Sequence, residues 1–84
     1  MRNIEPIQVT DADIMANSIE VSIDNVREND PACTLKWVLY CVSLVVNRGS
    51  MEAVGDDYTA VMASADNAYA FVAANFQPYP LTLI

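Results

Sequence analysis

The side chains best suited to chemistry in this 84-residue chain are its carboxylates. They stand close together at Asp11 and Asp13, and again at Asp56 and Asp57, and such pairs can carry out general acid–base catalysis or bind a hard cation. The chain has no histidine to complete an acid–base site. The roughly six to eight oxygen ligands that Ca²⁺ requires are not evident around either pair. Both pairs lie at the start of expected helices, where acids stabilise the first turn, so we interpret them as helix-start residues.

The sequence supports a nucleophilic or phosphate-binding site no better than it supports an acid–base or cation site. A serine or cysteine nucleophile needs a positioned base, and the single lysine, Lys36, lies beside an apolar segment. No glycine-rich phosphate loop exists, because the chain has only two glycines. If Cys33 and Cys41 share a helix, they lie roughly 12 Å apart along its axis, too far for a disulfide, so we expect reduced, packed thiols. The sequence predicts a protein that is not an enzyme and holds no cofactor or metal.

The charge balance narrows the class of partner. Eleven acids against four bases give a net charge of −7. Binding to phosphate groups needs clustered Lys and Arg, whereas the bases here are scattered along the chain, so neither nucleic acid nor an anionic membrane is expected as a direct partner. The charge favours a basic protein surface instead. The acids can also simply keep a small apolar domain soluble.

The composition further indicates association. A single domain of this size buries only about 60–65% of the surface that its unfolded chain exposes, yet 54% of the residues are hydrophobic. Disulfides and metals are not available to add stability, which leaves partner subunits. We therefore expect a homo-oligomer or a tightly bound partner. Residues 1–13 have no apolar core of signal-peptide length, so we expect an intracellular, cytoplasmic protein, including the cytoplasm of a host cell if the protein is viral.

The first elements expected to position these residues are an extended arm at 1–9, where Pro6 disfavours a helix, and a helix at 11–28. Two patterns compete within the second segment. The stretch "IEVSID" alternates as a half-buried strand would. The longer window places apolar residues at spacings of four and three, as one stripe of a helix does. That stripe consists of Ala12, Ala16, Ile19, Ile23 and Val26. The helical pattern covers more residues, so a helix is predicted, with residues 19–24 as the ambiguous part.

A second helix is predicted at 31–48. Asp30 can cap it, Pro31 suits its first position, and Gly49 can end it in the left-handed conformation. The run between Trp37 and Val46 is apolar on nearly all sides. It is half the length of the roughly 20 residues that cross a bilayer, so it predicts a buried central helix and not a membrane anchor.

A third, alanine-rich helix is predicted at 56–76, and Ser64 can cap a new helix within it, so one kinked helix or two short ones are both open. Residues 78–84 form an extended tail, because two prolines exclude a helix. The tail either stays within its own chain, where it folds back on the core or pairs with residues 4–9, or it docks onto another subunit. The expected fold is thus a single, mainly α domain: a three-helix bundle, or four helices if the third is interrupted, with extended segments at both ends.

Two surfaces of this expected bundle are candidate binding sites. The first helix carries acids along one side, and these form either a solvated face or an acidic ridge that binds a partner. They are Asp13, Glu20, Asp24 and Glu28. An apolar surface for an oligomer or a partner is expected from residues left uncovered on the first two helices. These are Trp37, Tyr40, Leu44, Ile14 and Val21.

The function that the sequence favours is non-catalytic protein binding. The acidic ridge would engage a basic surface, such as the groove of a nucleic-acid-handling protein, as small acidic inhibitors encoded by phages and other mobile elements do. This is an analogy of size, charge and lack of chemistry. The alternative is a self-assembling structural or assembly subunit of a phage-like particle, which the apolar surface would support.

Overall fold

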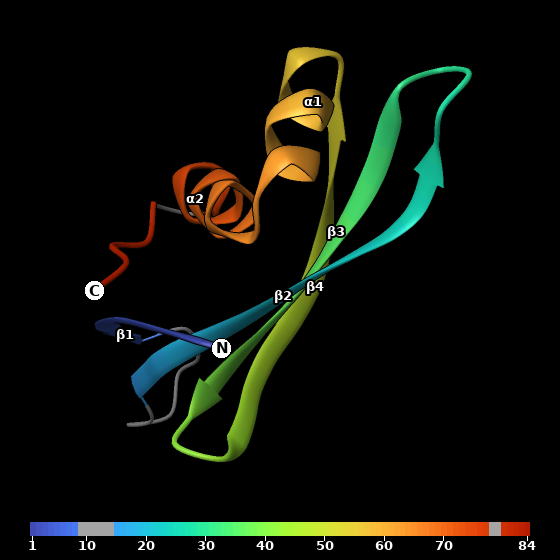
Figure 1. The fold of residues 1–84 in the computed structure, drawn as a ribbon. Helices are drawn as coiled ribbons and strands as arrows, with labels where there is room; N and C mark the ends of the chain where they lie inside the picture. Colours follow the sequence, from blue (N-terminus) through green and yellow to red (C-terminus); the bar gives the residue numbers. More distant parts are fainter. Residues whose placement is uncertain (9–14, 78–79) are drawn as a thin grey trace.

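The computed structural model, which describes residues 1–8, 15–77 and 80–84, is mostly β (Figure 1). A four-stranded antiparallel sheet has the order β1-β2-β3-β4, and two short helices follow it in the chain. The elements are β1 (Arg2–Gln8), β2 (Met15–Arg27), β3 (Ala32–Cys41), β4 (Leu44–Val54), α1 (Asp56–Ala63) and α2 (Ala65–Asn75). The expected mainly α bundle is therefore wrong, because the segments predicted as helices 11–28 and 31–48 contain three strands.

In β2 the alternating pattern prevails over the helical one. Ile19 is fully buried and Val21 packs against the core, while Glu20 between them is exposed. The apolar stripe that favoured a helix is divided, since Ile23 and Val26 are 38% and 44% exposed. A sheet buries alternate residues, and cross-strand packing then stabilises β-branched side chains that a helix accommodates less well.

The predicted central helix is a hairpin of β3 and β4. The chain reverses at Val42 and Ser43, so that Cys41 pairs with Leu44. The apolar run is rich in valine and aromatic residues, which favour strands. Pro31 stands in the turn before β3 instead of starting a helix. Gly49 lies inside β4, where an added Cβ would clash with the indole ring of Trp37, so glycine leaves room for that ring.

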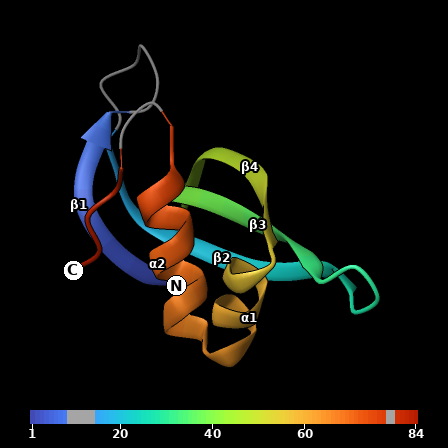
Figure 2. The same cartoon turned by 90° about the horizontal axis from the view of Figure 1, so that it is seen from above.

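The sheet has two faces of different character, which the register assigns. Ile19 pairs with Leu39 and Leu35 with Met51, so these side chains share the face that we call the covered face. Both helices lie against this face, and the sheet curls around α2 (Figure 2). The opposite side, the open face, carries the intervening residues of the three longest strands. They are Ser18, Glu20, Ser22 and Asp24 on β2, Thr34, Lys36, Val38 and Tyr40 on β3, and Arg48, Ser50 and Glu52 on β4.

The core lies between the covered face and the helices. Its largest fully buried side chains come from both layers: Ile4, Ile19, Leu35, Leu39, Val61, Val72 and Cys33. Trp37 packs edge-to-face on Phe76, with ring centroids 4.9 Å apart. Such aromatic pairs add to the stability that burial provides.

The helical segment follows the predicted pattern more closely. α1 begins at Asp56 after Gly55, whose positive φ of 57° suits glycine. Ser64 separates the two helices, and its hydroxyl accepts a hydrogen bond from the Asn67 amide at 3.1 Å, as an N-cap does. The Asn67 side chain also donates to the Ala60 carbonyl at 2.9 Å, which ties α2 to α1. The helix start and the alternative of two short helices are both confirmed.

The two ends of the chain meet at the β1 edge. Residues 1–9 were predicted to be extended, and those described form β1, an edge strand whose register is irregular around Pro6. Leu83 forms an antiparallel bridge with Ile4, the Glu5 amide donates to the Thr82 carbonyl at 2.9 Å, and the Ile84 amide donates to the Asn3 carbonyl at 3.0 Å. The tail therefore folds back along β1 (Figure 2), which confirms the first of the two predicted arrangements.

Candidate functional site

The acids predicted to form a helical ridge lie on a strand and a turn. Glu20 and Asp24 project from the open face of β2, and Glu28 belongs to the turn between β2 and β3. Asp13 is outside the described residues. The ridge on a helix is therefore wrong, because the described residues of the predicted helix 11–28 form a strand and the start of a turn. A spacing of four keeps Glu20 and Asp24 on one side in either structure, since four residues are two full periods of a strand.

Asp24 is the most strongly engaged of these acids. Its carboxylate lies 2.9 Å from the Lys36 ammonium group and accepts a hydrogen bond from the Asn25 amide at 2.8 Å. The hydrogen bond from Lys36, together with that amide and the positive charge, holds the pKa of Asp24 below its ordinary value. Because both side chains are exposed, the pair contributes little to stability. Asp24 is partly neutralised and is a poor candidate for attracting a partner.

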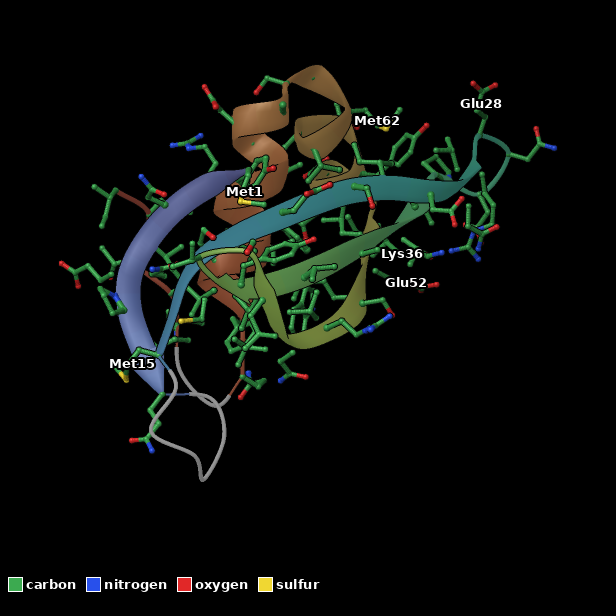
Figure 3. The ribbon with its side chains drawn as sticks, turned by 90° about the horizontal axis from the view of Figure 1, so that it is seen from below. Met1, Met15, Glu28, Lys36, Glu52 and Met62 are labelled. Carbon is green, nitrogen blue, oxygen red and sulfur yellow. The ribbon has the colours of Figure 1, made fainter. Side chains whose placement is uncertain are left out.

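Other carboxylates gather at the end of the molecule where the β2–β3 hairpin turns. The Gly55 amide donates to the Pro31 carbonyl at 3.1 Å, so the start of α1 lies next to this turn. We call this region the acidic end; it consists of Glu28, Asp30, Asp56 and Asp57. Figure 3 shows Glu28 at the tip of the hairpin, pointing away from the rest of the chain. None of the four carboxylates forms an ion pair with another described residue.

The middle of the open face combines polar groups with a small apolar area. Lys36 pairs directly with Ser22 on one side and Ser50 on the other, and Val38 and Tyr40 lie half-buried further along β3. A shallow hollow here is lined in part by the two serines, Lys36 and Arg48. A serine beside a lysine can be a nucleophile with its base, but the Lys36 ammonium group is bound to Asp24 in the open. The arrangement offers contacts for binding and no activated nucleophile.

The residues predicted to form one apolar oligomer surface are separated by the sheet. Trp37 and Val21 lie on the covered face and pack against the core. Tyr40 is on the open face, and Leu44 is 57% exposed next to the turn between β3 and β4. Ile14 lies outside the described residues. This prediction of a common surface is wrong, because neighbouring residues of a strand point to opposite faces.

The β3–β4 turn forms an apolar end that the sequence did not single out. Val42 is 76% exposed and has a positive φ of 59°, a conformation that is strained for a β-branched residue. Its amide donates to the Asn17 side chain at 3.2 Å. Met1 and Ile84, both largely exposed, line a hollow together with Val42. The local signal was a valine in a position where hairpins usually place Gly or Asn.

The two cysteines are free, as expected. Cys33 is buried in the core, where burial raises the pKa of its thiol. Cys41 is half-buried near the end of β3. Within the described part of the chain, no group of three or more Cys, Asp or Glu side chains is placed to share a metal ion. No helix of the described residues is long and apolar enough to cross a membrane.

Comparison with known proteins found no matching family model, no similar curated protein and no similar solved structure. The function must therefore be argued from the surfaces of this chain.

Proposed function

We propose that this chain is a non-catalytic binding protein whose acidic end engages a basic surface of another protein. One observation carries the proposal: four carboxylates without ion pairs among the described residues lie together at one end of the molecule. They are Glu28, Asp30, Asp56 and Asp57. The other interpretation of these acids, a solvated surface that keeps the protein soluble, is tested by the same experiment.

The contrast with the paired acids supports this choice. Asp24, Glu52 and Asp66 each face a base of the same chain, at 2.9, 3.0 and 2.7 Å respectively. A partner that took over these carboxylates would first have to break an existing pair. The carboxylates of the acidic end form no ion pair with a described residue, so Lys or Arg of a partner can bind them without displacing a base. Such charges accelerate encounter and add charge-assisted hydrogen bonds.

The partner class follows from the same chemistry. A basic groove that normally holds nucleic acid presents clustered Lys and Arg, which is the surface that several carboxylates at one end of a molecule fit best. We therefore propose a nucleic-acid-handling protein as the partner and inhibition by occupation of that groove as the mode of action. Duplex DNA or RNA added to the complex is expected to compete with this chain for the partner.

Affinity capture tests the proposal. The purified chain is immobilised, and proteins retained from an extract at about 50 mM and about 500 mM salt are identified, since the Debye length falls below about 5 Å over that range. The variant Glu28→Gln/Asp30→Asn is compared with Glu5→Gln/Glu20→Gln. The two variants change the net charge equally, but Glu5 and Glu20 lie elsewhere on the sheet, on β1 and β2.

The expected result is a partner with a basic surface that is retained at low salt, is lost at high salt, and is lost in the acidic-end variant but not in the control. Equal loss in both variants would mean that only net charge matters. Binding that ignores both salt and the acidic-end variant would contradict the proposal.

Self-assembly remains a second candidate function, as a structural or assembly subunit of a phage-like particle. One specific observation favours it. The outer edge of β4 forms no backbone hydrogen bonds with any described residue.

A further inference from the structure

β4 is a long strand with a free edge. It has 11 residues, contains no proline, and among residues 1–8, 15–77 and 80–84 pairs only with β3, on its inner side. It forms the border of the sheet opposite β1 (Figure 2). A free edge of this length is a template for another strand, and proteins usually block such edges with proline, bulges or a covering segment. From Asn47 to Val54 the pairing with β3 is regular, so β4 presents a straight edge there.

The sequence of β4 is complementary to itself. When two identical strands pair antiparallel, a two-fold axis passes through the centre and perpendicular to the sheet, so each residue faces a residue of the same face. Pairing centred on Ser50 places Arg48 opposite Glu52 of the second copy, and Glu52 opposite its Arg48. Both side chains are on the open face, because Arg48 pairs with Val38 of β3 and Glu52 pairs with Thr34 of β3. Two opposite-charge pairs therefore form at once.

The neighbouring registers lack this match. Centred on Arg48 or on Glu52, the pairing would place that charge opposite its own copy. Centred on Gly49 or Met51, it would place both charges opposite neutral residues. Directly opposed like charges destabilise a sheet, whereas opposite charges stabilise it. The charges of β4 thus select the register centred on Ser50.

Arg48 also lacks an ion-pair partner among the described residues of its own chain. The other three bases each form an ion pair: Arg2 with Asp66, Arg27 with Glu52 and Lys36 with Asp24. In a chain with a net charge of −7, Arg48 has no ion pair with a described residue. A second copy supplies the missing carboxylate, and Glu52 then lies between the Arg27 of its own chain and the Arg48 of the other.

We propose that two copies of this chain pair their β4 strands antiparallel about a two-fold axis at Ser50, which joins two four-stranded sheets into one continuous sheet. The helices of both copies then lie on the same side of it. Val54, which is 54% exposed, lies at each end of the new pair. The pairing uses none of the four carboxylates of the acidic end, so it does not depend on the proposed function.

Sedimentation of charge variants tests the pairing, and mixing supplies the control. Arg48→Glu alone places two acids opposite each other at both positions, and Glu52→Arg alone places two bases there. Each variant is expected to weaken dimerisation about tenfold or more, because both ion pairs become like-charge pairs. An equimolar mixture restores opposite charges at both positions, so it is expected to form a heterodimer close to the native affinity. Glu20→Arg, with the same charge change as Glu52→Arg on β2, is expected to dimerise normally.

Cysteine cross-linking tests the register. In a Cys41→Ser background, Ser50→Cys places two thiols directly across the axis, with Cα atoms about 5 Å apart, so a disulfide is expected to form readily. Glu52→Cys places the two cysteines roughly 14 Å apart along the strand, beyond the limit of about 7 Å for a disulfide. This variant is expected to remain uncross-linked under the same oxidation.

Several outcomes would overturn the proposal. A monomer at about 100 µM would do so, because that concentration populates any pairing of moderate affinity. So would a dimer that is indifferent to Arg48→Glu, variants that fail to recover on mixing, or equal cross-linking of the two cysteine variants. If Val42→Asp abolished the dimer and Arg48→Glu did not, the contact would lie at the apolar end instead.

Discussion

The two edge strands of the sheet, β1 and β4, differ in whether another segment of the chain covers them. β1 is seven residues long, contains Pro6 and has an irregular register. The C-terminal tail covers it through the Leu83 bridge to Ile4 and two further backbone hydrogen bonds. β4 is longer and has no proline, and its own register shift, at Val46, leaves the stretch from Asn47 to Val54 regular. On its outer side it is bordered by none of the described residues. The chain thus contains a segment able to cover an edge, and that segment covers β1.

This difference suggests that the exposure of β4 is a feature of the protein and not a consequence of its small size. An uncovered edge is a site of uncontrolled strand addition unless something limits it. On β4 the charge pattern limits strand addition, because Arg48 and Glu52 favour pairing with a second copy of β4 in a single register. The open edge and the charges together describe a specific contact, whereas the β1 edge is closed within the chain.

The largest effect is expected from removing residues 81–84, because the deletion uncovers the β1 edge and leaves it as open as the β4 edge. The deletion removes buried Leu81 and uncovers Ile4, so we expect a loss of about 2–5 kcal/mol in the free energy of unfolding, as for truncation of a buried leucine. Urea unfolding measures it. Ile84→Ala, at a largely exposed position, is the control and is expected to change stability by about 0.5 kcal/mol or less. Unchanged stability after the deletion would show that the tail does not protect this edge.

Gly49→Ala tests the interior of the β4 edge. The new Cβ would clash with the ring of Trp37, which is itself packed on Phe76, so the indole or the strand must shift. We expect a loss of about 1–3 kcal/mol, as for overpacking, and a change in the fluorescence of the single tryptophan. Ser50→Ala, one residue along, is expected to change neither. A native spectrum for Gly49→Ala would contradict the position of Trp37 over β4.

The smallest effect on stability is expected from Asp24, which lies on β2, an inner strand between the two edges of the sheet. Its pKa is lowered in the folded state from an ordinary value of 3.8, so its ionised form favours folding. That contribution is complete above pH 3.8 and is lost as the pH falls through the lower folded pKa. The native chain is therefore expected to be slightly more stable than Asp24→Asn at pH 6, and this difference is expected to shrink towards pH 2. In a Lys36→Met background the difference at pH 6 is expected to be smaller. A difference that grew on acidification would have the wrong sign.

The parts of the fold that the sequence predicted are those whose signals are local. Pro6 indicated an extended edge, Asp56 and Asp57 marked a helix start, and Ser64 marked the break between helices, since caps and prolines act on their immediate neighbours. Each of these features depends on a few adjacent residues. Pairing of the tail with residues 4–9 was one of the arrangements left open, because the apolar residues of the tail indicate burial but do not say where.

The β3–β4 hairpin was missed because its turn lacks the usual residues. The β3–β4 turn uses Val42 in the left-handed conformation, where Gly or Asn is typical, so the apolar run showed no reversal. In β2 the helical and strand periods coincide at several positions, and only cross-strand packing decides between them. The contact surfaces were missed for the same reason, because strand order and register determine which charges share a face and which strand is left at the edge.

The central claim is that β4 pairs with a second copy of the chain and that β1 does not. Hydrogen exchange measured at increasing protein concentration tests this claim. The account predicts that β4 amides that do not bond to β3 exchange more slowly as dimers form, while exchange at β1 stays independent of concentration. Exchange at β4 that does not depend on concentration, or slowing confined to β1, would contradict it.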